Sequence, residues 1–416
     1  MTTDDPDHVL NAVVLPPDAA QALRRHLGKP ADTPLRIAYV PGPGDVVGTF
    51  DHWQQGRHDP RVPVITYSAM FYSLVHRLGA QALVLTAENR QPMAQTTAVT
   101  FRHVPRETGQ NGFRYRLAEA RYAKALAQVV NDWQPDITVV GSDAPTGLFH
   151  SLHVPAILSA HNSFWPMGQR PRNLRARLAL LPRIRSLRHV AAALCTSAEC
   201  AHQIVAVAGS KPTFVEVPQV VSTDMPPSVA PPRDVAHRIT FIGRIEENKG
   251  VFDLLTAVEN LAASFPSLSL TFAGDGTASA NLATAAGSSS LGDQVRLLGR
   301  IDSGAVHALL DASDIVVCPT RSSFNEGLAL VVVEAAIHGR PCVISSVVPA
   351  GQLFPDSCSI FAADDAAALQ TALRRLIEDP AALRRMSEQA LRHRHTCLDR
   401  RQSWGSQLYL AFLETR

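Results

Sequence analysis

Short apolar runs alternate with longer amphipathic segments along most of the 416-residue chain, and this alternation constrains the fold more than any other feature. The runs at 35–40 (LRIAYV), 81–86 (QALVLT) and 136–141 (DITVVG) are apolar throughout, as in strands that are buried on both faces. Segments of helical character lie between them, for example at 68–78 and 116–133. We therefore predict an α/β protein with doubly wound parallel sheets that helices cover on both sides.

A proline-rich stretch divides this pattern into two blocks. Residues 217–233 (VPQVVSTDMPPSVAPPR) contain five prolines and no helical period, which is typical of a linker between domains. The alternation restarts with RITFIGR at 238–244. The expected parts are an N-terminal domain at 1–216, a linker at 217–236, a C-terminal domain at 237–398, and a helix within 399–416 that packs back on the N-terminal domain.

Composition excludes several classes of protein. Lys and Arg number 39 against 37 Asp and Glu, so the net charge of +2 gives no overall preference for nucleic acid. The six cysteines form no CxxC pair, so neither a zinc ribbon nor a disulfide framework is indicated. The N-terminus is acidic and no apolar run approaches the roughly 20 residues that span a bilayer. We expect a globular protein of the cytoplasm.

Residues 319–341 are the segment richest in chemistry. They follow a strand-like run, so they should lie at the carboxyl edge of a sheet, where ligands bind in α/β folds. Glu326 and Glu334 stand eight positions apart near the start of an expected helix, about 12 Å along its axis, a separation that suits a sugar nucleotide. The N–H groups of residues 327–329 would face a phosphate. The alternative is that LALVVV is a buried strand flanked by solvated glutamates.

A second group of residues is Gly243-Arg244-x4-Lys249-Gly250, which begins where strand 238–242 ends. Two cations beside a helix N-terminus suit a diphosphate, and Arg244 can bind one with two parallel hydrogen bonds. An isolated arginine and lysine can equally be a solvated surface pair. The order and spacing of the neighbouring motifs help to decide between the two.

Taken in order, the motifs FIGRIEENKG, LTFAGDG, VRLLGRI, ASDIVVCPT and NEGLALVVVEAAIHGRPCV resemble the nucleotide-binding half of retaining glycosyltransferases of family 4. The resemblance covers about residues 238–392, whereas the N-terminal half matches only in pattern. It implies the GT-B fold, in which two Rossmann-like domains in tandem face each other across a cleft. The N-terminal domain would then bind the acceptor and the C-terminal domain the nucleotide sugar.

The resemblance also implies roles for individual residues. Arg244 and Lys249 would hold the donor diphosphate and neutralise the departing nucleoside diphosphate without a metal ion or a cofactor. Glu326 would contact the transferred sugar, and Glu334 would bind the ribose. The backbone near the sugar and phosphate would be that of Gly327, Leu328 and Ala329. Ala329 departs from the family, which often has glycine there.

Two features of the N-terminal half also resemble the family. His161, in ILSAHNSFWP, resembles the strand-end histidine that approaches the donor sugar, and it joins Glu326, Arg244 and Lys249 as an expected catalytic residue. Gly42 and Gly44, in the loop PGPG after the first strand, resemble the glycine-bearing loop that faces the donor. The alternatives are a loop histidine bonded to backbone and an ordinary structural Gly-Pro turn.

The one strongly basic stretch lies at 167–190. It carries seven arginines and no acidic residue, interleaved with leucines. Such a segment can lie on an anionic membrane, and it can also be a solvated helix face. A membrane contact would suit an acceptor that is a polyprenyl-diphosphate-linked sugar.

The resemblance to family 4 leads us to expect a retaining, metal-independent hexosyltransferase. Its donor would be GDP-mannose or a UDP-hexose, and its acceptor a carbohydrate or lipid-linked oligosaccharide in polysaccharide or glycolipid assembly at the inner face of the membrane. Two alternatives remain, a partner subunit that binds a sugar nucleotide without turnover and an epimerase of the GT-B fold. A nicotinamide dehydrogenase is disfavoured because no GxGxxG follows the first strand.

Overall fold

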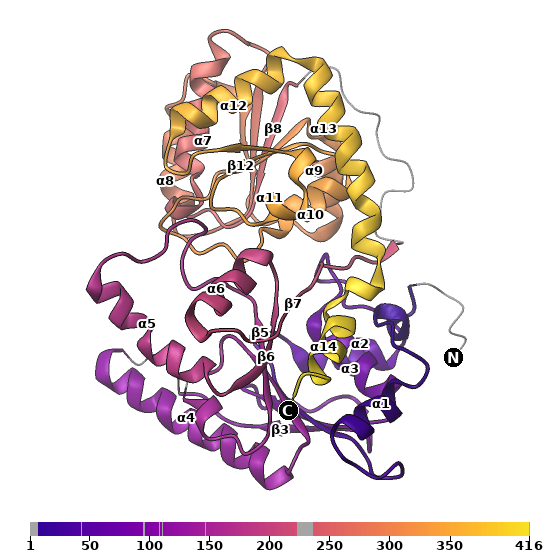
Figure 1. Ribbon diagram of the computed structural model, residues 1–416. Coiled ribbons are helices and arrows are strands. Elements are labelled where there is room, and N and C mark those ends of the chain that lie inside the picture. Colours follow the sequence, from indigo (N-terminus) through magenta and orange to yellow (C-terminus); the bar gives the residue numbers. More distant parts are fainter. Residues whose placement is uncertain are drawn as a thin grey trace. The chain divides into compact units, whose positions relative to one another are not determined.

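The computed structural model describes residues 7–415, apart from residues 43, 95, 108, 110, 146 and 223–235. Contacts divide the chain into two compact units (Figure 1). The first contains the chain up to His161, Pro171–Val221 and the segment from Asp399, and the second contains Asn162–Arg170 and Ser222–Leu398. The sequence prediction instead assigned residues 162–170 to the first domain. Most of the predicted linker, at 223–235, lies outside the described residues.

The first unit is built on a seven-stranded parallel sheet of order β3-β2-β1-β4-β5-β6-β7. The winding direction reverses between β1 and β4, whose carboxyl ends therefore border the kind of crevice in which doubly wound sheets bind ligands. The strands are β1 (Arg36–Val40), β2 (Gln81–Thr86), β3 (Val99–His103), β4 (Ile137–Gly141), β5 (Ala156–Ala160), β6 (Val190–Cys195) and β7 (Thr213–Val215).

Helices surround this sheet, and one of them comes from the end of the chain. That helix, α14 (Trp404–Phe412), packs on α3 (Tyr67–Arg77), β6 and β7. Its Trp404, Leu408 and Phe412 side chains are fully buried in the core of this unit. The other helices are α1 (Ala19–His26), α2 (Val46–Gln54), α4 (Gly112–Trp133), α5 (Leu174–Leu187) and α6 (Ala198–Ala208).

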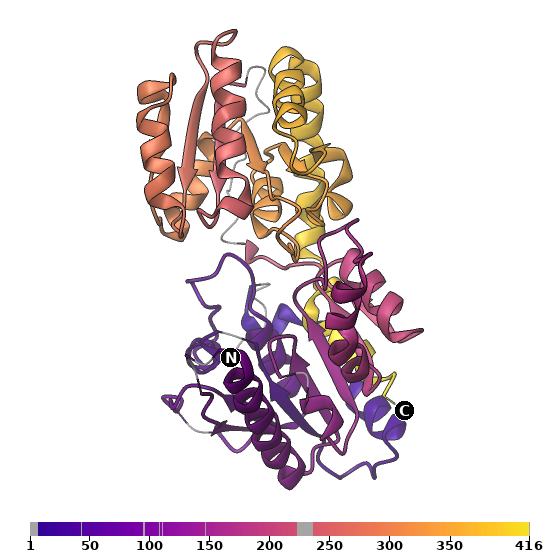
Figure 2. The same ribbon diagram turned by 90° about the vertical axis from the view of Figure 1, so that its left-hand side faces the viewer.

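The second unit has a six-stranded parallel sheet of order β10-β9-β8-β11-β12-β13, with helices on both sides (Figure 2). Its winding reverses between β8 and β11. The strands are β8 (Arg238–Ile242), β9 (Ser269–Ala273), β10 (Val295–Leu297), β11 (Ile315–Cys318), β12 (Cys342–Ser345) and β13 (Cys358–Phe361). The helices are α7 (Val251–Ala262), α8 (Ser279–Gly287), α9 (Ser303–Ala312), α10 (Leu330–Ile337), α11 (Ala350–Leu353), α12 (Ala366–Glu378) and α13 (Pro380–His393).

These two sheets confirm the predicted fold class. The continuous apolar runs are buried strands, as in β4, where every residue is buried. One face of α7 is apolar and also buried, including Leu254, Val258 and Leu261. Within the part of the chain that the structure describes, no helix is both long enough and apolar enough to span a bilayer.

Candidate functional site

Two loops meet at the carboxyl edge of the second sheet because glycine lets their backbones touch. A Cβ atom at Gly250, whose φ is +73°, would lie 2.0 Å from the carbonyl oxygen of Pro319. The loop after β8 can therefore lie directly against the loop after β11. The N–H of Arg321 also donates to the carbonyl of Asn248 at 2.9 Å. This contact brings the predicted Arg244 and Lys249 to the segment that carries Glu326.

Lys249 and Glu326 form an ion pair in this position. The Lys249 Nζ lies 2.6 Å from Glu326 Oε2, and the two side chains are only 13% and 10% exposed. The same carboxylate oxygen accepts a hydrogen bond from the Thr320 hydroxyl at 2.9 Å. The ring of Phe324 lies 4.0 Å from Lys249 Nζ, within the range of a cation–π interaction. The predicted phosphate ligand and the predicted sugar ligand thus contact each other directly.

The Arg244 side chain also lies near the Phe324 ring, and it is 58% exposed. Its guanidinium carbon is 5.3 Å from the Phe324 ring, and its NH1 donates to Glu246 Oε1 at 2.7 Å. An exposed pair of this kind contributes little stability, about 0–1 kcal/mol. The Arg244 guanidinium can therefore exchange Glu246 for a stronger anion such as a diphosphate.

The segment after Glu326 differs from the sequence prediction in its geometry. Helix α10 begins only at Leu330, so Glu326 lies in the preceding loop and the axial separation of about 12 Å expected for a helix does not apply. The cause is Ala329, whose φ of +74° interrupts the helix. The alternative of a buried strand at LALVVV is also wrong, because residues 330–337 are helical.

The start of α10 offers several backbone donors. Among the described residues, none accepts a hydrogen bond from the N–H groups of residues 327–331. A left-handed conformation at an alanine costs roughly 1–2 kcal/mol, so the surrounding structure must impose it. Unbonded N–H groups and the positive end of the helix dipole together make an anion site.

Glu334 projects from the second turn of α10 and is half-buried. Burial raises the pKa of its carboxyl to about 7. No other described residue donates a hydrogen bond or forms an ion pair with this carboxyl group. The described part of the protein therefore leaves this carboxyl group available to a ligand, as its predicted role in binding the ribose requires.

In the first unit, the loops after β1, β4 and β5 bring Gly42, Asp143 and His161 together. A Cβ atom at Gly42 would lie 3.1 Å from Asp143 Oδ2 and 3.9 Å from His161 Cδ2. One at Gly141 would lie 2.6 Å from the Gly42 nitrogen, so glycine is required for the close approach of β1 and β4. Gly44 is different, since nothing lies within 4 Å of a Cβ built there.

His161 is held by side chains rather than by a backbone carbonyl. Its Nε2 lies 3.3 Å from the Ser159 hydroxyl, and its ring packs against the Tyr67 ring with centroids 4.6 Å apart and planes tilted by 34°. Burial lowers the pKa of His161 to about 4, although the nearby Asp143 carboxylate acts in the opposite direction. The imidazole is therefore neutral at pH 7.

A cavity of about 460 Å³ lies beside Gly42 and Asp143, within the range of small-ligand sites. It is lined by the ends of β1, β2 and β4, the start of α2, and part of α4. Its polar lining includes Glu88, Arg106 and Tyr122. The sequence analysis missed these residues, although Glu88 and Asp143 each follow an apolar strand-like run.

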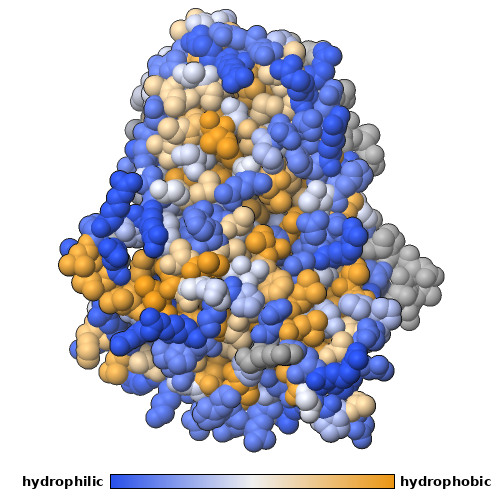
Figure 3. All heavy atoms as spheres, in the orientation of Figure 1, coloured by the Kyte–Doolittle hydropathy of each residue, from blue (hydrophilic) through white to orange (hydrophobic). Residues whose placement is uncertain are grey.

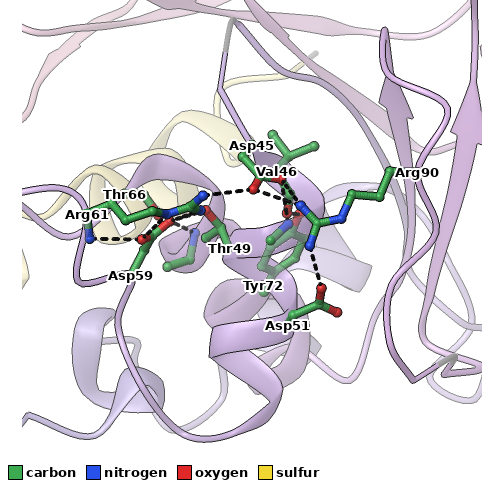
Figure 4. A network of polar contacts seen from close by, with 11 residues as sticks. Asp45, Val46, Thr49, Asp51, Asp59, Arg61, Thr66, Tyr72 and Arg90 are labelled. Atoms are coloured by element: carbon green, nitrogen blue, oxygen red, sulfur yellow. Dashed lines mark hydrogen bonds and ion pairs between the residues drawn. The ribbon is translucent and has the colours of Figure 1, made fainter.

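A network of charges lies at the edge of this cavity (Figure 4). Asp45, which lines the cavity, lies 3.1 Å from Arg61 NH1 and 2.9 Å from Arg90 NH1. Arg61 also pairs with the buried Asp59 at 2.6 Å, and Arg90 with the buried Asp51 at 3.2 Å. Both arginines are thus fixed by carboxylates, and this part of the unit carries more acidic than basic groups.

Comparisons with known proteins agree with this architecture. Residues 231–393 match the family "Glycosyl transferases group 1". The glycogen synthase of Mycobacterium tuberculosis is 34% identical over 164 residues, which are 38% of this chain and 38% of that protein. The phosphatidyl-myo-inositol mannosyltransferase of Propionibacterium freudenreichii is 29% identical over 151 residues, 35% of this chain and 36% of that protein. The structure of sucrose-phosphate synthase from Thermosynechococcus elongatus covers 90% of this chain and 96% of its own, with a TM-score of 0.64 and 15% identity.

The fold and its structural neighbours place the chain in the GT-B class of α/β proteins. The match of residues 231–393 to the group 1 family confirms the resemblance drawn from the motifs. The chain spans 38% or less of the length of the two curated relatives above. The part that matches the family, at 231–393, contains Arg244, Lys249, Glu326 and Glu334.

Proposed function

We propose that the protein is a retaining glycosyltransferase that moves a hexosyl group from a nucleoside-diphosphate sugar to a hydroxyl of a carbohydrate. The observation that carries the proposal is the Lys249–Glu326 pair next to the N–H groups of residues 327–331, for which the described part of the chain offers no acceptor. A cation, a carboxylate and a helix N-terminus are the groups needed by a diphosphate and the sugar attached to it. The group 1 domain found over the same residues supports this assignment.

In the proposed mechanism, charge stabilisation comes from the protein. The diphosphate takes Lys249 and Arg244 as partners, and the start of α10 binds its remaining oxygens. The Glu326 carboxylate then accepts hydrogen bonds from hydroxyls of the transferred sugar. The half-buried Glu334 accepts hydrogen bonds from the ribose hydroxyls. As the sugar–phosphate bond breaks, the two cations stabilise the leaving nucleoside diphosphate, so we propose a reaction without a metal ion.

Retention of configuration is proposed from the family resemblance. The leaving phosphate oxygen accepts the proton of the acceptor hydroxyl on the face where the new bond forms, and His161 approaches the donor sugar. GDP-mannose and UDP-hexoses remain the proposed donors. The similarity to a relative named as a mannosyltransferase gives GDP-mannose some support.

We propose that the cavity of the first unit binds the acceptor. Glu88 and Asp143 have no ion-pair partner among the described residues, and Arg106 is held by Glu119 through two hydrogen bonds of 3.0 and 2.9 Å. Carboxylates accept hydrogen bonds from sugar hydroxyls and repel phosphates. An uncharged sugar ring therefore fits this cavity better than a sugar phosphate, and the diphosphate of a lipid-linked acceptor would lie outside it.

We further propose that α5 contacts an anionic membrane. Leu174, Leu178 and Leu181 lie on one face of the helix and are 72%, 52% and 48% exposed. Arg175 and Arg177 flank this stripe, and Figure 3 shows hydrophobic and strongly hydrophilic side chains next to each other in this region. Leucines can enter the lipid while arginines reach the phosphates. Binding to phosphatidylglycerol vesicles at low salt should fall in Leu178→Gln, and equal binding by both proteins would oppose this proposal.

The first test is ligand-dependent thermal stability with GDP, UDP, ADP and their common sugar derivatives. A ligand at 100 times its dissociation constant adds about 2.7 kcal/mol, a shift of several degrees. The variant Arg244→Ala should lose the shift, whereas Arg374→Ala, which removes an exposed arginine of α12, should keep it.

The responding donor is then incubated with sugar acceptors, and release of the nucleoside diphosphate is measured. A shift without transfer would favour the non-catalytic subunit, and epimerised donor would favour the epimerase.

A further inference from the structure

Hydrogen bonds connect the side chains of Trp404, Ser159 and His161 in series. The indole N–H of Trp404, at the start of α14, donates to the Ser159 hydroxyl at 2.9 Å. The same hydroxyl lies 3.3 Å from His161 Nε2. Trp404 and Ser159 are 1% and 2% exposed, so water cannot easily replace either partner. The C-terminal segment thus contributes a donor to the hydrogen-bond network of His161.

The direction of these hydrogen bonds follows from which groups can donate. An indole nitrogen can only donate, so Ser159 must accept from Trp404. The Ser159 proton then needs an acceptor, and His161 Nε2 is the one that the described residues offer. A proton on Nε2 instead would leave the buried serine hydroxyl without an acceptor, which is unfavourable.

We infer that Trp404 and Ser159 are positioning residues that fix the neutral His161 in the tautomer with its proton on Nδ1. Nδ1–H is then a donor without an acceptor among the described residues, and it can bind a substrate oxygen. The inference rests on the proposed function only in this last step. The tautomer itself is a property of the protein without a substrate.

The ring is also held from the side. The Tyr67 ring packs against His161, and the Tyr67 hydroxyl donates to the buried Glu216 carboxyl at 2.8 Å. The Tyr67 and Trp404 rings are 5.5 Å apart. Asp143, in the loop after β4, is the charged group that faces the imidazole. The position of the ring and the site of its proton are therefore set by different neighbours.

The inference can be tested by nitrogen NMR of the full-length protein labelled at histidine. We expect the wild-type His161 signals to report a protonated Nδ1 and an unprotonated Nε2 at pH 7. Trp404→Phe keeps an aromatic ring in the core but removes the donor, and the population with a protonated Nε2 should rise. Ser159→Ala should have a larger effect, and Ser159→Thr should restore the wild-type signals.

A matched control exists in the same unit. Trp53 Nε1 donates to Ser73 Oγ at 2.9 Å, so Trp53→Phe removes an equivalent hydrogen bond. It should leave the His161 signals unchanged. A protonated Nε2 in the wild type, or unchanged signals in both Trp404→Phe and Ser159→Ala, would overturn the inference.

Activity gives a second readout that separates this inference from the proposed function. If the protein transfers sugar, kcat should fall about tenfold in Ser159→Ala, the lower end of the losses seen when a metal-bound histidine loses its outer hydrogen-bond partner, with nucleotide binding preserved. A correct tautomer in a protein that transfers no sugar would refute the proposed function and leave the tautomer assignment intact. Full kcat in a variant with the altered tautomer would refute the positioning role.

Discussion

The pairing of Lys249 with Glu326 can be tested by its effect on stability, independently of any substrate. Lys249→Met removes the cation and leaves the Glu326 carboxylate, 10% exposed, with Thr320 as its remaining hydrogen-bond donor. Breaking a buried pair by removing one partner costs about 3–5 kcal/mol. Here we expect the lower part of this range, because both side chains keep some contact with water. The expected decrease in Tm is about 10 °C.

The double variant gives the decisive comparison. Lys249→Met combined with Glu326→Gln removes both charges, and replacement of a whole buried pair is often nearly neutral. The two single variants should therefore cost more in sum than the double variant, by about 2–4 kcal/mol, a coupling in the range of close charge pairs. Hydrogen exchange of amides in β8 and β11 measures this energy locally, within the second unit.

An exposed pair supplies the control. Arg374 and Glu378 lie 3.3 Å apart on α12 and are 36% and 52% exposed. The same cycle there should give a coupling of about 0.5 kcal/mol or less. If the cycle at Lys249 and Glu326 gave an equally small coupling, the ion pair would not contribute to stability and the reasoning would be refuted.

Three further predictions concern backbone strain and buried charge. Ala329→Gly should relieve the left-handed strain and leave stability unchanged or raise it by up to about 1 kcal/mol in urea unfolding, since glycine also loses entropy on folding; a clear loss would contradict it. Gly274→Ala should cost about 3 kcal/mol, because its Cβ would lie 1.8 Å from the Gly243 oxygen, whereas Gly287→Ala, in open space, should not destabilise. Burial raises the pKa of Glu216 from 4.5 to about 7, so its contribution to stability is complete below pH 4.5 and is lost as the pH rises to 7. Glu216→Gln should thus gain up to about 3 kcal/mol over the wild type between pH 4.5 and 8, and parallel pH profiles of the two proteins would exclude this effect.

The strands at the centre of each sheet could be predicted because burial on both faces leaves continuous apolar runs. The run at 136–141 corresponds to β4 and that at 238–244 contains β8. The edge strand β3 was missed, because its residues VTFRH alternate in burial and form a short segment. Helix α2 was missed as well, since VVGTF resembles a strand in local preference and becomes helical with Asp45 as its N-cap.

The site could be predicted only in part. The residue types that suit a diphosphate and a sugar are visible in the sequence as Arg244, Lys249 and Glu326. The contact between Lys249 and Glu326 could not be predicted, because it depends on a glycine at position 250 that lets two loops touch and on an alanine at 329 that delays the start of α10. Hydrophobic periodicity carries no information about such backbone geometry.

The C-terminal helix shows why long-range contacts matter for the site as well as for the fold. Trp404 lies 245 positions after Ser159, and no local pattern connects them. Yet α14 fills the core of the first unit with Leu408 and Phe412 while its first residue reaches the serine beside His161. A substitution that disturbs the packing of α14 therefore acts on the first unit, although the helix follows the second unit in the sequence. Its effect should appear in the His161 signals, because Trp404 donates to the serine beside that ring.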